Sequence, residues 1–159
     1  MMDRSNTIRS LAASSNGAVL VEFAFIAPML ATLLLGTVDM GLWNTARLSV
    51  DRAARAGAEY AVANGYSSSA VAAAITSNAP ARSGMLSAIT ATPAPTRWYG
   101  CVVSNSSVAV TVQGAVCADG TTAGTYVTSN ARANYSYAVP WPGLGSTATI
   151  SSSVTVRIS

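Results

Sequence analysis

The sequence predicts an α+β fold, in which a long N-terminal helix, a membrane span continuing as an amphipathic stalk, packs on a small antiparallel β-sheet. Three observations lead to this prediction. Residues 18–38 form an apolar run with one charged side chain, Glu22. Helical spacing of small and charged residues continues to residue 64. Beyond residue 85, apolar residues alternate with small or polar ones, which is typical of strands with one buried face.

The composition argues against several classes of protein. Half of the 159 residues are hydrophobic and only 9% are charged, so the chain does not read as disordered. It contains no His, which removes the commonest general base and metal ligand. Its Arg residues are scattered, without the basic patch of a nucleic-acid-binding protein. We therefore expect no enzyme, no catalytic residues, no metal, no cofactor and no nucleic-acid partner.

The N-terminal region divides at Gly17. Residues 1–17 are a polar leader, and the apolar run of 21 residues at 18–38 follows at once. As a helix this run is about 30 Å long, which matches the hydrocarbon core of a bilayer. A secretory signal peptide has a shorter apolar region with its cleavage site on the far side. The arrangement predicts cleavage between Gly17 and Ala18 and retention of the apolar segment as a transmembrane helix.

Glu22 is the one charge inside the predicted span. A carboxylate within a membrane helix costs about 2.5–3.5 kcal/mol on insertion scales, so it usually has a partner and a function. After cleavage, the new α-amino group of Ala18 on a neighbouring subunit is a natural partner. The alternative is that Glu22 snorkels to the interface from an ordinary signal anchor.

The residues from Gly17 to Phe23, a Gly, four apolar residues, Glu and an aromatic, resemble the type III prepilin signal. With the sequence that follows, to residue 64, they are similar to the TadE-like minor pseudopilin family of tight-adherence (Tad) systems. The resemblance assigns Gly17 and Ala18 to the cleavage site, Glu22 and Phe23 to the assembly and cleavage motif, and Pro28 to a helix kink. Its further features are Asp39, Gly41 and an Ala-rich stretch at 53–58.

The resemblance implies a pilin-like architecture and a structural role in a type IV pilus of the Tad class, in assembly, secretion and surface adhesion. It implies four partners: a prepilin peptidase, other pilin or pseudopilin subunits bound through the N-terminal helix, an inner-membrane assembly platform, and membrane lipid. It also implies a location in the bacterial inner membrane or an extracellular pilus. The alternative function is an uncleaved, single-pass, membrane-anchored binding or adhesion module.

The stalk, residues 39–64, carries two patterns. Charges of alternating sign recur at i,i+4 spacing from Arg47 to Glu59, which places them on one helix face, either solvated or in contact with another subunit. Small residues form a stripe beside them, which suits close packing against a covering sheet or a neighbouring helix: Ala46, Val50, Ala53, Gly57 and Ala61. Asn64-Gly65 predicts the end of the helix.

Residues 65–159 read as a Ser/Thr-rich β-sheet domain in the periplasm or outside the cell. A short second helix is expected at 70–76, followed by four or five strands from the candidates 86–92, 97–103, 106–113, 125–139 and 147–158. Turn residues separate these segments: Pro93 and Pro95, Ser104-Asn105, Asp119-Gly120, and Pro140 to Gly145.

Cys101 and Cys117 are the two cysteines of the chain. They are too few for a structural zinc site, so the pair predicts either a disulfide in an oxidising compartment or two buried thiols. A disulfide between them would contribute about 3 kcal/mol on the chain-entropy model. Arginine counts on the two sides of the span do not set the orientation. The short leader and the downstream cysteines instead favour a cytoplasmic N-terminus.

Overall fold

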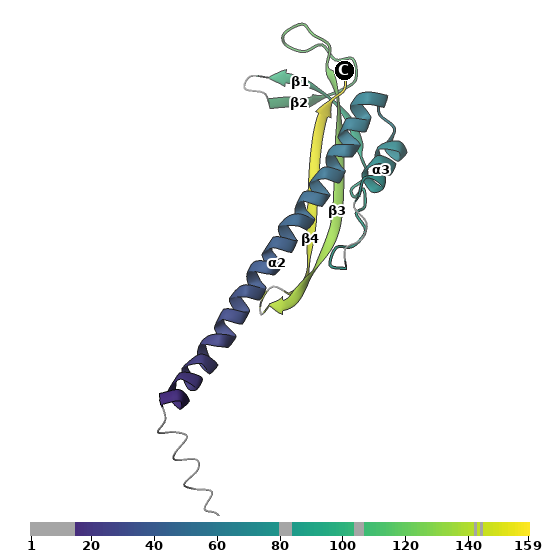
Figure 1. Ribbon diagram of the computed structural model, residues 1–159. Coiled ribbons are helices and arrows are strands. Elements are labelled where there is room, and N and C mark those ends of the chain that lie inside the picture. Colours follow the sequence, from purple (N-terminus) through teal and green to yellow (C-terminus); the bar gives the residue numbers. More distant parts are fainter. Residues whose placement is uncertain (1–14, 80–83, 104–106, 142, 144) are drawn as a thin grey trace, which may run out of the picture. The chain divides into compact units, whose positions relative to one another are not determined.

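A computed structural model describes residues 15–79, 84–103, 107–141, 143 and 145–159. The chain divides into two compact units, Met1–Gly41 and Leu42–Ser159, with the boundary inside the first described helix. The elements are α2 (Ser15–Asn64), α3 (Ser68–Ser77), β1 (Thr96–Val103), β2 (Ser107–Thr111), β3 (Gly124–Trp141) and β4 (Gly145–Arg157) (Figure 1). Positions 1–14 of the predicted leader lie outside the described residues, as does the expected Ser104-Asn105 turn.

Helix α2 ends where its sequence predicts. Gly65 has a φ of +80°, a conformation that glycine adopts without steric cost. Its N–H donates to the carbonyl of Ala61 at 3.0 Å, which satisfies one of the last free carbonyls of the helix. The short helix expected at 70–76 follows as α3, which buries Val71 and Ile75.

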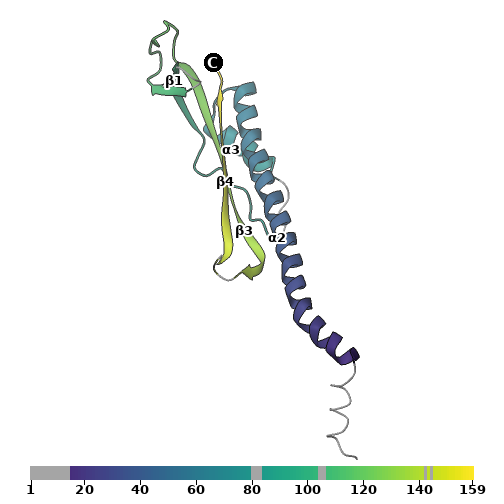
Figure 2. The ribbon, with the colours of Figure 1, turned by 90° about the vertical axis from the view of Figure 1, so that its left-hand side faces the viewer.

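The four strands form one antiparallel sheet in the order β2-β1-β3-β4. With the long N-terminal helix, this sheet confirms the predicted α+β class. Strands β3 and β4 are much the longest, and Figures 1 and 2 show them running beside residues 42–64 of α2 and beside α3. The predicted domain limits at 17, 38 and 64 stay predictions.

The core of the second unit lies between the helices and one face of β3 and β4. From the helix it takes mainly Ala and Val side chains, and from the strands it takes alternate residues such as Val127, Ala131 and Ile150. Tyr135 is the largest fully buried side chain, and its ring meets that of Tyr137 edge-on at a centroid distance of 5.5 Å. Small residues on α2 let the helix backbone come close to the sheet, so the core is thin.

One strand candidate, residues 86–92, does not form a strand. It is joined to β3 by two isolated bridges, Leu86 to Tyr135 and Thr90 to Arg132, and by hydrogen bonds between Ser87 and the backbone of Asn134. The two positions are four residues apart on one side and three on the other, so an uninterrupted ladder cannot join them. The segment still buries Leu86 and Ile89 in the core. Its apolar alternation therefore reflects burial without regular pairing.

Candidate functional site

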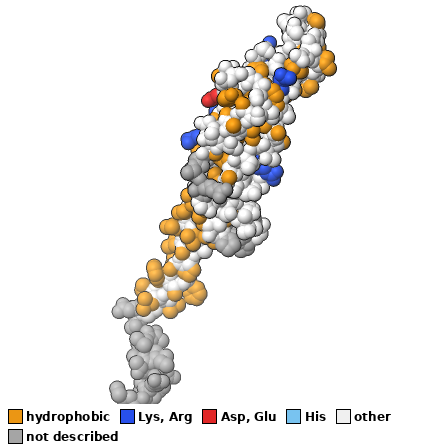
Figure 3. Space-filling model, turned by 90° about the vertical axis from the view of Figure 1, so that its right-hand side faces the viewer, with side chains coloured by type: hydrophobic (Ala, Val, Ile, Leu, Met, Phe, Trp, Pro, Cys, Tyr) orange, Lys and Arg blue, Asp and Glu red, His pale blue; other side chains and the backbone are white. Residues whose placement is uncertain are grey.

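The first unit presents an apolar helix surface. Among the described residues, one helix, Gly17–Asn64, is long and apolar enough to cross a membrane, and its most apolar window is not buried. Large side chains such as Phe25, which is 78% exposed, cover this segment. Figure 3 shows hydrophobic side chains over the face of the segment that it presents. An exposed apolar helix of this length is stable in lipid, where its backbone groups bond within the helix.

The predicted cleavage residues lie near the start of α2. Gly17 and Ala18 are in the first turn, because the helix begins at Ser15. Glu22 follows one helical turn after Ala18 and is exposed, as is Phe23. Cleavage at Gly17 and the assembly role of Glu22 remain predictions.

Pro28 lies inside α2, which continues on both sides of it. Its nitrogen has no hydrogen to donate to the carbonyl four residues earlier. Two threonines of the same segment bond back to the helix: the Thr32 hydroxyl donates to the Met29 carbonyl and the Thr37 hydroxyl to the Leu34 carbonyl, both at 2.8 Å. These bonds satisfy polar side chains within an apolar surface, a role that the hydropathy pattern alone does not reveal.

The charged face of the stalk is not a continuous ladder of ion pairs. Arg55 Nε donates to Asp51 Oδ2 at 2.9 Å, while Arg47 lies over the ring of Trp43 at 5.7 Å. Asp51 Oδ1 accepts a second hydrogen bond, from the Ser152 hydroxyl of β4 at 2.9 Å. Asp51 thus links the helix to the sheet, a contact that the i,i+4 spacing could not predict.

The small-residue stripe faces the covering sheet and α3. Ala46, Val50, Ala53, Gly57 and Ala61 are all buried. At Gly57 a Cβ atom would collide with Ser129 Oγ of β3 and would lie 2.6 Å from Ile75 Cγ1 of α3. Only glycine fits this crossing without displacing a neighbour. One of the two alternatives for the stripe, a covering sheet, is therefore realised within the chain.

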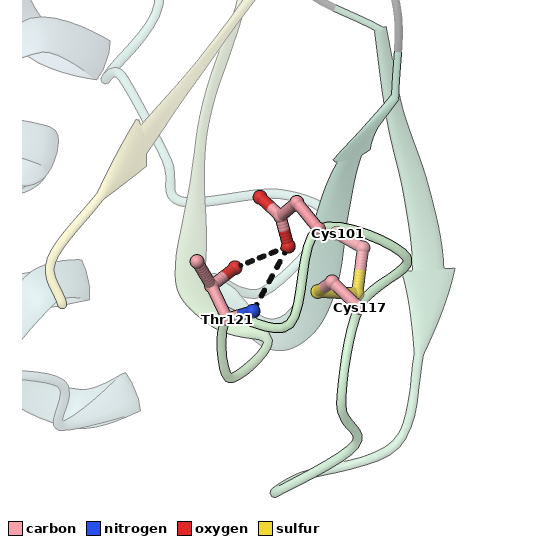
Figure 4. The surroundings of a disulfide bond; sticks show 4 residues. Cys101, Cys117 and Thr121 are labelled. Atoms are coloured by element: carbon pink, nitrogen blue, oxygen red, sulfur yellow. Dashed lines mark hydrogen bonds between the residues drawn. A yellow bond between two sulfur atoms is a disulfide. The ribbon is translucent and has the colours of Figure 1, made fainter.

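Cys101 and Cys117 form a disulfide, with their Cα atoms 5.5 Å apart (Figure 4). The bond ties β1 to the loop between β2 and β3, and Cys117 is 8% exposed. The loop turns at Asp119-Gly120, where the Gly120 N–H donates to the Cys117 carbonyl at 2.9 Å. Hydrogen bonds from the Thr121 hydroxyl and N–H lower the pKa of Asp119. Of the two predicted states of the cysteines, the disulfide is confirmed.

Within the described part of the chain, no group of three or more His, Cys, Asp or Glu side chains could hold a metal ion. The two cysteines form a disulfide and so cannot act as thiolate ligands. Asp51 and Asp119 accept hydrogen bonds from the hydroxyls of Ser152 and Thr121. The arrangement offers surfaces for contact with lipid and protein. That the protein is not an enzyme stays a prediction.

Comparison with known families addresses the first part of the chain. Residues 17–59 match the family model of TadE-like proteins. The match confirms the resemblance predicted from the prepilin-like motif, and it begins at the predicted cleavage site. It associates the TadE-like segment with Tad pili. No curated protein and no solved structure matches the chain significantly.

Proposed function

We propose that this protein is a structural minor subunit, a pseudopilin, of a Tad-type pilus, and that a prepilin peptidase cuts it after Gly17. One observation carries the proposal: the TadE-like match starts at Gly17, in the first turn of a helix whose apolar segment is exposed and long enough to span a membrane. The function is assembly, through packing of helices from several subunits, and no chemical step is involved.

The proposal gives each unit a location. The apolar segment waits in the inner membrane, in contact with lipid and the assembly platform, and the folded unit lies outside the cytoplasm. The disulfide supports this orientation, because such bonds persist in oxidising compartments. From there the subunit enters or primes a filament and contributes to secretion and surface adhesion.

Glu22 supplies the specificity of assembly in this proposal. Its carboxylate is exposed on the apolar helix and would be costly in lipid without a cation. The segment from 18 to 38 contains no Arg or Lys. The α-amino group created at Ala18 of an adjacent subunit therefore neutralises it, and the pair forms only when cleaved subunits meet.

Mass spectrometry of the membrane-extracted protein tests the cut, and we expect Ala18 as the mature N-terminus. Glu22→Gln, which keeps the shape and removes the charge, should still be cut and remain in the membrane but should fail to enter pilus complexes. Leu33→Gln is the matched control, since it adds the same amide to an exposed position of the same apolar segment outside the motif from Gly17 to Phe23. If Glu22→Gln assembles at the wild-type level, its pairing role is wrong.

The second candidate is an uncleaved, membrane-anchored binding or adhesion module. One observation favours it: α2 already includes Ser15 and runs through Gly17, so the predicted cut falls within helical backbone. An intact Met1 in the extracted protein, together with no difference between Glu22→Gln and the wild type in the pilus-complex assay, would establish this anchor in place of the pilus subunit.

A further inference from the structure

The sheet of the second unit has a face that no described helix covers. Figure 2 shows α2 and α3 on one side of the β3–β4 ribbon. Ile150, which is buried, and Ser152, which bonds Asp51, point to that side. Because side chains alternate, every second residue from 128 to 136 on β3 and from 147 to 157 on β4 points the other way. We call these residues the outer ladder.

The outer ladder consists of hydrogen-bonding side chains. Apart from Arg132 and Arg157, each of its residues is Ser, Thr or Asn. At one end the Trp98 indole donates to the Thr128 hydroxyl at 3.0 Å, and the hydroxyls of Thr128 and Thr155 are 3.0 Å apart. Farther along, the Thr149 hydroxyl donates to Asn134 Oδ1 at 3.0 Å. Hydroxyls and amides thus stand in ordered rows on an extended surface.

The charge of the outer ladder is entirely positive. Arg132 lies opposite Ser151 and Arg157 lies opposite Tyr126, and both arginines are exposed. Six residues along β4 separate the two levels, so the two arginine positions lie about 20 Å apart along the strands. The side chains of the ladder include no carboxylate, and Arg157 Nε donates to the main-chain oxygen of Ser159 at 3.0 Å. Its complement is an extended ligand with widely spaced negative charges.

A second copy of this chain does not supply that charge. Residues 42–159 contain seven arginines and three acids, a net charge of +4. Of the three acids, Asp51 pairs with Arg55 and Asp119 is held by Thr121. The third acid, Glu59, lies on α2 and not on the ladder, so the ladder of one copy offers no negative charge to the ladder of another.

The spacing of negative charges differs among the anionic polymers that could bind the outer ladder. Double-stranded DNA carries one negative charge per about 1.7 Å, and its binding proteins match it with clustered Arg and Lys. Two arginines about 20 Å apart are a poor match for that density. A lipid surface calls for apolar side chains that insert, and the outer ladder has none. An acidic polysaccharide fits, because it carries many hydroxyls for each carboxylate.

We propose that the outer ladder binds an acidic polysaccharide, with Arg132 and Arg157 holding two carboxylates and the intervening Ser, Thr and Asn side chains bonding sugar hydroxyls. This inference names the adhesion target of the proposed function, and it rests on that function for the placement of the ladder outside the cytoplasm. A guanidinium suits the task, since its planar donors match a carboxylate.

The full chain in a nonionic detergent, with hyaluronan oligosaccharides as the probe, tests the proposal, because this polymer carries one carboxylate on every second sugar. We expect Arg132→Gln and Arg157→Gln each to weaken hyaluronan binding by about 3- to 10-fold, and the double variant to lose it. Ser153→Val should also weaken it, because it removes a hydroxyl from the ladder without changing charge. Arg52→Gln is the matched control: it removes the same charge from an exposed position on α2 and should leave affinity unchanged.

Four results would overturn the proposal: no binding of hyaluronan, equal binding of neutral dextran, an equal loss with Arg52→Gln, or tighter binding of double-stranded DNA than of hyaluronan. The assay uses purified protein and needs neither cleavage nor filament assembly. Failure here with a positive Glu22 experiment removes only the polysaccharide ligand. Binding of the polysaccharide together with a negative Glu22 experiment would contradict the pilus role and leave the polysaccharide ligand supported.

Discussion

Phe25 and Ala53 belong to the same helix, α2, yet Phe25 is 78% exposed and Ala53 is fully buried. The segment around Phe25 carries large apolar side chains on its surface, whereas the segment around Ala53 buries small ones against a sheet. Hydrophobicity alone therefore does not determine whether a helix face is exposed or packs in a protein core. Large exposed side chains suit a lipid solvent, and small buried ones suit close approach of another backbone.

The largest expected effect separates the two regions by removing one aromatic ring from each. Tyr135→Ala should lower the free energy of unfolding of the second unit by about 3–5 kcal/mol, because it leaves a cavity in a thin core. Phe25→Ala, on the exposed helix, should leave that free energy unchanged. Thermal unfolding of the full chain in detergent, followed by near-ultraviolet circular dichroism, measures both. Equal losses of unfolding free energy in the two variants would contradict the distinction between the exposed and the buried part of α2.

Removing the disulfide tests how far the thin core depends on a cross-link. The double variant Cys101→Ser, Cys117→Ser should lose about 3 kcal/mol of stability, because its unfolded chain gains freedom. A reducing agent should lower the wild-type melting temperature to that of the double variant and leave the variant itself unaffected. A wild-type protein insensitive to reduction would contradict this expectation.

The close crossing at Gly57 gives a smaller effect. Gly57→Val should cost about 1–3 kcal/mol, because the added atoms collide with Ser129 and Ile75. Ala63→Val, at an exposed position of the same helix, introduces the same β-branched side chain without the collision. Urea unfolding of the two variants under identical conditions compares them. Helix propensity alone would favour Gly57→Val and disfavour Ala63→Val, so a loss at position 57 no larger than that at position 63 would contradict the packing explanation.

The smallest effect is the pH dependence contributed by Asp119. Its pKa is lowered in the folded state by hydrogen bonds from Thr121. The bonds therefore stabilise the fold fully above the ordinary carboxyl pKa, and this contribution is lost as pH falls through the lowered folded value. Asp119→Asn should flatten the acid limb of the melting-temperature curve slightly, because it lowers the melting temperature a little near neutral pH and leaves the acid end nearly unchanged. A steeper acid limb in the variant would show that the sign is wrong.

Local signals in the sequence account for much of the fold. The apolar run at 18–38 predicts the helix surface, and Asn64-Gly65 predicts its end, because both depend on neighbours within a few residues. Alternation of apolar and hydroxyl residues located four strands, and Gly17 with Glu22 identified the TadE-like segment. The prediction of a strand at 86–92 was wrong, because a buried irregular segment can show the same alternation of apolar and polar residues as a strand.

By itself, the sequence determined the helix, its apolar surface, the strands and the motif that begins at Gly17, since each follows from residues close together in the chain. Only the tertiary structure decided which stalk charges pair, why position 57 must be small and which face of the β3–β4 ribbon remains open. The bond between Asp51 and Ser152 joins residues 101 positions apart. Such contacts depend on register and packing between distant segments, and no spacing within either segment encodes them.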